Sequence, residues 1–129
     1  MPEVTVSWGE LADKITILEI KRERLDDAAA QANVRRELAG LDRWRPTLAS
    51  EGRLAKLVTA LAEVNRALWE TEDAIRAKEA RGAFDDEFVA LARAVYRQND
   101  RRTALKHAIN LALGSELVEV KSYPDYPQG

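Results

Sequence analysis

The stretch DDEFVALARAVYRQNDRRTALKHAINLAL, residues 85–113, decides the fold that this sequence predicts. Its apolar spacing indicates one long helix, in which successive side chains turn by about 100°. One face of that helix carries five apolar side chains, Phe88, Leu91, Val95, Ile109 and Leu113. The same face also carries Asn99, Arg102 and Lys106.

These three polar residues need partners if the face is buried. A buried cation or amide without a partner costs several kcal/mol. The residues therefore mark either an internal polar network or a ligand site, and the sequence leaves both alternatives open.

Composition limits the classes of function. A length of 129 residues suits about one domain, so we expect a single helical domain over residues 1–129. Twenty basic against twenty-two acidic side chains give a formal charge of −2, which disfavours nucleic acid as a partner. With no Cys and one His, no metal site or cofactor is expected. No membrane segment or signal peptide is recognisable, so we expect a cytoplasmic protein.

The first predicted helical hairpin covers residues 7–50. The sequence Ser7-Trp8-Gly9-Glu10 matches a capping box, in which Ser7 and Glu10 each accept from the other's backbone N–H. Asn33 is the expected N-cap of the second helix, and Pro46 is expected to end or kink that helix.

The second predicted hairpin covers residues 54–114 and has a coiled-coil-like apolar pattern. Asp85 is the expected N-cap of its second helix, and Gly114 the expected left-handed residue after it. A turn near residue 82 would bring Asn65 level with Asn99, so that the two amides form a buried pair. Residues 115–129 are expected to form an extended tail, and residues 4–6 and 117–120 to be able to pair as a small two-stranded ladder.

Four cations lie on apolar stripes of the predicted helices: Arg22, Arg45, Arg102 and Lys106. If the helices share one core, such cations converge where little water enters and can bind a carboxylate or phosphate. The alternative, which we favour, is that they pair with glutamates across helix seams or bury only their stems. The residues predicted to bind a ligand, if there is one, are Arg22, Asn99, Arg102 and Lys106. No catalytic residue is predicted.

A pair of carboxylates, Glu70 and Asp73, is a candidate metal site. Glu70 and Asp73 share a helical face, as in all-α magnesium-dependent nucleotide pyrophosphohydrolases. Those enzymes need a second acidic pair on a preceding helix, and no pair of acidic residues with the required spacing occurs there in this sequence. A solvated face is therefore the favoured interpretation.

Residues 6–21, 33–38, 96–102 and 118–123 together resemble a family of small uncharacterised bacterial proteins. The resemblance covers nearly the whole chain and implies a compact bacterial protein with no assigned activity. Helix length and the cationic positions are also similar to those of helical chorismate mutases, which hold a dicarboxylate with buried Arg and Lys. That second resemblance rests on no specific motif.

We therefore predict an all-α protein built from two antiparallel helical hairpins. The leading hypothesis for its function is a non-enzymatic helical module that binds another protein or itself. Because the second hairpin outruns the first and leaves apolar seam uncovered, a homodimer is expected. The alternative is a small-anion-binding or enzymatic bundle that uses its buried Arg and Lys.

Overall fold

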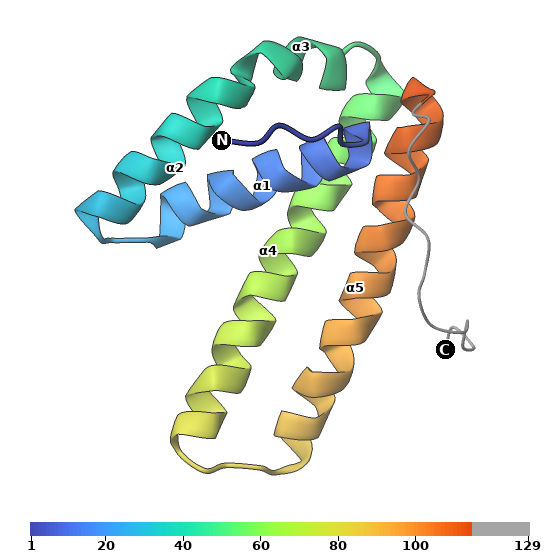
Figure 1. Cartoon of the computed structure of the whole chain (residues 1–129). Helices are drawn as coiled ribbons and strands as arrows, with labels where there is room; N and C mark the ends of the chain where they lie inside the picture. Colours follow the sequence, from blue (N-terminus) through green and yellow to red (C-terminus); the bar gives the residue numbers. More distant parts are fainter. Residues whose placement is uncertain (115–129) are drawn as a thin grey trace.

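The computed structural model describes residues 1–114, and its elements are helices (Figure 1). They are α1 (Trp8–Arg24), α2 (Ala28–Leu41), the 3₁₀ turn η1 (Asp42–Trp44), the short α3 (Arg45–Leu48), α4 (Gly52–Ala80) and α5 (Asp86–Leu113). No strand occurs in this part of the chain. The prediction of an all-α protein with two helical hairpins, α1/α2 and α4/α5, is confirmed.

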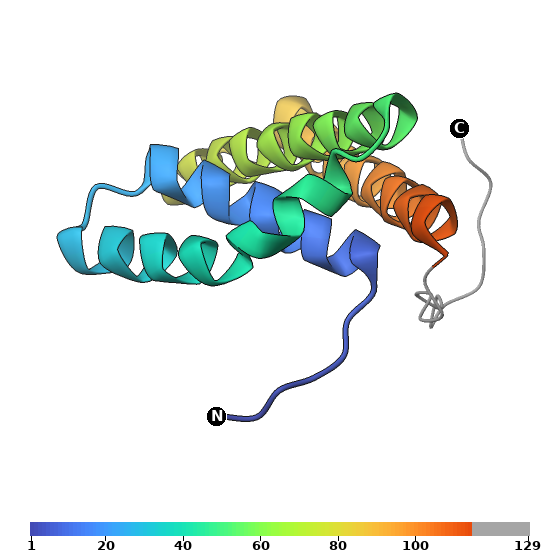
Figure 2. The ribbon, with the colours of Figure 1, turned by 90° about the horizontal axis from the view of Figure 1, so that it is seen from above.

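Helix α1 is the central helix of the fold. It packs against α2 on one side and against both α4 and α5 on the other (Figures 1 and 2). Its residues Ala12, Ile15, Leu18 and Ile20 are each at most 4% exposed. Because these four residues point in more than one direction around the helix, α1 is covered on more than one side.

One hydrophobic core joins the two hairpins. It includes Leu11, Ile15 and Leu18 of α1, together with Val34 and Leu38 of α2. Leu54 and Leu61 of α4 and Ile109 of α5, each fully buried, complete the contact with the second hairpin. The core therefore lies where α1 crosses the upper half of the α4/α5 pair in Figure 1.

Three of the predicted helix ends are confirmed. The Ser7 hydroxyl accepts from the backbone N–H of Glu10 at 3.2 Å, and the Asp85 carboxylate accepts from that of Phe88 at 2.9 Å. Gly114 has a φ of 65°, the left-handed conformation that glycine adopts without strain.

The second helix begins earlier than predicted. Asp27, not Asn33, is its N-cap and accepts from the backbone N–H of Ala30 at 2.8 Å. The alanines that follow Asp27 are strong helix formers, so residues 28–32, which precede the expected N-cap, are already helical. The bend expected at Pro46 is present, because η1 and α3 replace a continuous helix after Leu41.

The predicted two-stranded ladder has no counterpart among the described residues. Residues 4–6 belong to no strand, and residues 117–120 and the predicted tail 115–129 lie outside the described part of the chain.

Gly9 allows α1 and α5 to approach closely. A Cβ at this position would lie 2.3 Å from the carbonyl O of Lys106 and 2.9 Å from Oδ1 of Asn110. The first of these atoms belongs to the backbone and cannot move aside as a side chain can. Only glycine therefore fits here without a shift of one helix against the other.

We expect Gly9→Ala to lower the free energy of unfolding by about 1–3 kcal/mol, the usual cost of overpacking. Gly40→Ala is the matched control, because a Cβ at Gly40 of α2 meets nothing within 4 Å. That variant should gain about 0.5–1 kcal/mol from helix propensity. Urea unfolding followed by circular dichroism measures both, and equal effects of the two substitutions would contradict the close approach.

The turn between α4 and α5 is held by Lys78, whose side chain is only 8% exposed. Its Nζ lies 3.0 Å from Asp85 Oδ2 and 3.4 Å from Glu87 Oε2. The backbone N–H of Phe88 and the ammonium of Lys78 both lower the pKa of Asp85 below its ordinary value of 3.8. A carboxylate with a lowered pKa stabilises the fold above its unfolded-state pKa, and this stabilisation is lost as pH falls through the folded-state pKa.

We expect acid to remove this contribution below the ordinary pKa of 3.8. Wild type should therefore be more stable than Asp85→Asn at pH 6, and the difference should shrink towards zero as pH falls below that value. Asn keeps the N-cap, so the comparison isolates the carboxylate charge. Urea midpoints at several pH values measure it. A difference that is constant from pH 6 to strongly acidic conditions would refute it.

Candidate functional site

A polar cluster lies where α1, α4 and α5 meet. The Asp13 carboxylate of α1 receives two hydrogen bonds from the Arg102 guanidinium of α5, with Arg102 Nε 2.8 Å from Asp13 Oδ1 and Arg102 Nη2 on Asp13 Oδ2. The Asn65 amide of α4 donates to Asp13 Oδ1 and to Thr16 Oγ1, both at 2.9 Å. The Thr16 hydroxyl in turn donates to the carbonyl O of Asp13 at 2.8 Å. Side chains of α4 and α5 therefore both donate to one carboxylate of α1.

This cluster is enclosed on the side of Asp13. Asp13, Thr16 and Asn65 are 3–5% exposed, and the Arg102 side chain is 29% exposed. A buried carboxylate is tolerated when it is paired and its oxygens accept hydrogen bonds, and both oxygens of Asp13 do. The cluster therefore meets the hydrogen-bonding requirement of its most buried charge from within the protein.

Two further polar contacts join α5 to the start of α1. Lys106 Nζ lies 2.6 Å from Glu10 Oε1, and the backbone N–H of Gly9 donates to Asn110 Oδ1 at 2.6 Å. Arg102, Lys106 and Asn110 follow one another at four-residue intervals, so they lie on one face of α5. We call these three contacts the α1–α5 polar ladder: Arg102–Asp13, Lys106–Glu10 and Asn110–Gly9.

The Ser7 half of the predicted capping box is confirmed. Ser7 caps α1, but the Glu10 carboxylate forms the ion pair with Lys106.

The predicted residues do not all come together. Arg102 and Lys106 belong to the polar ladder, and Asn99 lies beside it, with Oδ1 3.5 Å from Arg102 Nη1. Arg22 is exposed near the other end of α1. The fourth cation of the predicted set, Arg45, pairs with Glu19 at 2.6 Å and Asp42 at 2.8 Å.

Arg45 thus belongs to a separate contact between α3 and α1. Glu19 first, and then Asp42, raises the pKa of Arg45 above its ordinary value. The cations on the apolar stripes therefore do not share a single pocket. The assignment of Arg22, Asn99, Arg102 and Lys106 to ligand binding stays a prediction.

The predicted pair of Asn65 and Asn99 is wrong. Asn65 donates to Asp13 and Thr16 of α1, because α1 lies across the hairpin and offers it a carboxylate and a hydroxyl. A charged acceptor binds an amide more strongly than a second amide does. The prediction was based only on the pairing of α4 with α5 and did not include α1 as a third helix.

Four residues of this region, Asp13, Thr16, Gly9 and Asn110, were not predicted as site residues from the sequence. The spacing of Asp13 and Thr16 places both on one face of α1, and Asn110 follows Lys106 by four residues. These spacings were signals of a polar seam. These spacings identify partners only if α1 is known to cross α5, and no local sequence pattern predicts that crossing.

The chemistry available to the described residues is narrow. Within residues 1–114, no three His, Cys, Asp or Glu side chains gather as a metal site would require. Asp73, one of the two carboxylates considered for a metal site, is exposed and lies 3.8 Å from Arg76. The neighbouring Glu72 is also exposed and lies 3.9 Å from the same guanidinium. None of the described helices has the length and apolar character that crossing a membrane demands.

Removal of Arg102 should leave a buried, uncompensated carboxylate. We expect Arg102→Met to cost about 2–3 kcal/mol of unfolding free energy, less than the roughly 3–5 kcal/mol of a fully buried pair, because Arg102 is partly solvated. The double variant Asp13→Asn/Arg102→Met removes the charge and keeps an acceptor for Asn65, so it should be more stable than Arg102→Met alone.

Urea unfolding measures this comparison. Arg66→Met is the matched control, because Arg66 pairs with Glu23 on the exposed surface and its loss should scarcely move the midpoint. If Arg102→Met and Arg66→Met have equal effects, the buried pair does not have the structural role assigned to it.

Comparison with known proteins gives a family without an assigned activity. The model of a family of unknown function, DUF6165, matches residues 2–127. No curated protein and no solved structure matches the chain. The resemblance to an uncharacterised family is thereby confirmed, while bacterial origin stays a prediction. Since the match covers nearly the whole sequence, the chain belongs to the family of unknown function DUF6165.

Proposed function

We propose that this protein is a non-enzymatic helical interaction module whose first partner is a second copy of itself. The proposed binding surface is the distal hairpin, which we define as residues 71–98 of α4, α5 and the turn between them. The observation that supports this proposal is a pair of long helices, half of which no other described element covers.

The coverage of the hairpin ends near its middle. Arg24, the last residue of α1, bonds to Glu70 of α4 at 2.8 Å. Beyond that point the ribbons of α4 and α5 continue without α1 or α2 beside them (Figure 1). Phe84, Val89 and Tyr96 of this part are 62%, 44% and 49% exposed.

The exposed apolar residues lie on a face of their own. Val89 and Tyr96 are seven residues apart, so they share one side of α5. Phe88 and Val95, each one residue earlier and about 100° away, are half-buried. Helix α5 therefore has a second apolar stripe, which a packed neighbouring helix would bury.

Charge supports a second copy as the neighbour. Lys78 of α4 contacts Asp85 and Glu87 at the start of α5, which fixes how the two antiparallel helices are aligned. In this alignment, the acidic residues Glu72 and Asp73 of α4 lie level with Arg93 of α5. The distal hairpin thus presents acidic and basic groups at one height. A two-fold axis there would bring α5 of one copy against α4 of the other, with opposite charges facing one another.

The paired cations support a non-enzymatic role. Arg102 and Lys106 already contact Asp13 and Glu10, so an anion at this place would have to displace a carboxylate. The separated carboxylate would then need another partner, which reduces the net gain from binding. A small-anion site at these residues is accordingly the weaker proposal.

The self-association proposal predicts a mass in solution of twice the chain's 14.5 kDa at micromolar concentration. Val89→Glu should raise the dissociation constant at least about tenfold, which corresponds to about 1.4 kcal/mol, because a charge would enter the apolar seam. Sedimentation equilibrium measures both. Leu111→Glu is the matched control, since Leu111 is 67% exposed on the same helix but outside the distal hairpin.

A single-chain mass for the wild type, or equal weakening by both variants, would refute self-association through this face. The competing anion site is tested separately by thermal unfolding with inorganic phosphate and small dicarboxylates. A concentration-dependent rise in melting temperature that disappears in Arg102→Met would favour the anion site instead.

A further inference from the structure

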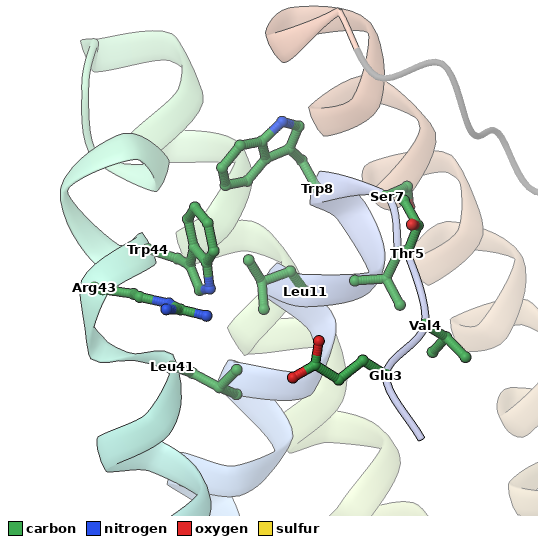
Figure 3. Close-up of a pocket in the computed structure, with 10 residues that line it drawn as sticks. Glu3, Val4, Thr5, Ser7, Trp8, Leu11, Leu41, Arg43 and Trp44 are labelled. Carbon is green, nitrogen blue, oxygen red and sulfur yellow. The ribbon is translucent and has the colours of Figure 1, made fainter. Parts of the chain in front are cut away.

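A cavity of about 460 Å³ lies beside the start of α1, away from the distal hairpin (Figure 3). Three elements form it: the segment that precedes α1, the first turn of α1, and the end of α2 with η1. Its side chains of main interest are Glu3, Trp8, Leu11, Leu41, Arg43 and Trp44.

The cavity is aromatic, with one group of each charge at its edge. The rings of Trp8 and Trp44 meet edge to face, with centroids 5.6 Å apart. The Arg43 guanidinium lies 4.8 Å from the Trp44 ring centroid. Figure 3 shows the Glu3 carboxylate on the side of the cavity opposite the tryptophans. Aromatic walls of this kind bind extended segments that contain proline and tyrosine.

One wall of the cavity is itself an extended segment with free edges. Val4 and Val6 are 80% and 52% exposed. The backbone of residues 2–6 forms no hydrogen bond to another described residue. An extended backbone with unpaired N–H and C=O groups can accept a second strand beside it.

We propose that the occupant of this cavity is the C-terminal segment of the same chain, with residues 117–120 beside residues 4–6 and residues 123–127 against the tryptophans. The sequence of the latter, Tyr123-Pro124-Asp125-Tyr126-Pro127, has the composition that aromatic grooves select. Its two prolines lack N–H groups and favour an extended backbone, so the segment loses little conformational entropy when it docks.

The end of α5 brings this segment within reach. Gly114 ends α5, and Asn110 in its last turn receives the N–H of Gly9, the residue after Trp8. The nine residues from Gly114 to Tyr123 can span up to about 30 Å when extended. The segment therefore starts on the side of the molecule where the cavity lies.

The charges of the two partners are complementary. Asp125 of the segment can meet Arg43, and Lys121 can meet Glu3. The family match supports the same conclusion, because it runs to residue 127 and so includes both the segment and the residues that line the cavity. A tail shared with the family as part of one domain is consistent with a fixed place on that domain.

The absence of cysteine permits a direct test on the full chain. Ser122→Cys creates one attachment point for a nitroxide spin label, and the indole N–H signals of Trp8, Trp44 and Trp69 report on three places. We expect the label to broaden the signals of Trp8 and Trp44 and to remove most of their intensity. Trp69 is the internal control, since it lies well along α4.

Equal intensity for all three indoles, with or without the label, would overturn the proposal. Mixing spin-labelled unenriched protein with unlabelled ¹⁵N-enriched protein identifies the source of any broadening. Loss of the Trp8 and Trp44 signals in that mixture would show a tail from another copy and would also overturn the intramolecular docking proposed here.

A charge exchange provides a second test. Arg43→Glu and Asp125→Arg should each restore much of the lost indole intensity in the spin-labelled protein, because each places like charges together. The double variant Arg43→Glu/Asp125→Arg should show the wild-type loss again. An additive effect of the two substitutions would contradict the pairing of Arg43 with Asp125.

Discussion

The contact between Asp13 and Arg102 determines how the two hairpins sit together. It fixes α1 against α5, and through Asn65 it also fixes α1 against α4. A buried ion pair adds little net stability compared with apolar packing of similar volume, but it strongly disfavours arrangements that separate its charges. The hydrophobic core supplies most of the driving force, while this pair selects one crossing geometry from those that the core would accept.

Several structural features could be predicted from local patterns. The ends of α5 follow from Asp85 and Gly114, whose chemistry acts on their immediate neighbours. The helical class follows from the spacing of aliphatic residues along the sequence. Such features need no knowledge of a distant segment, so sequence alone determines them.

The composition of the polar cluster could not be predicted in the same way. Asn65 and Asn99 have equivalent positions in an isolated hairpin, and only the presence of α1 gives Asn65 a different partner. The presence of Arg102 and Lys106 on an apolar stripe correctly indicated that both side chains need polar partners inside the protein. Their partners Asp13 and Glu10 are some 90 residues away in sequence, and a one-turn error in the crossing point would select other partners.

The spacing of the polar ladder explains why that crossing point is unique. If α1 moved by one turn towards its own N-terminus, Arg102 would face Ile17 in place of Asp13, and a guanidinium would be buried against an aliphatic side chain. Lys106 would then face Lys14, which carries the same charge. Gly9 would also leave the carbonyl of Lys106, and a bulkier residue would meet that backbone. Charge and steric fit thus reject the same displacement independently. A fixed crossing of α1 over the proximal half of the hairpin is also what keeps the distal half uncovered, so the ladder and the proposed binding surface have one structural cause.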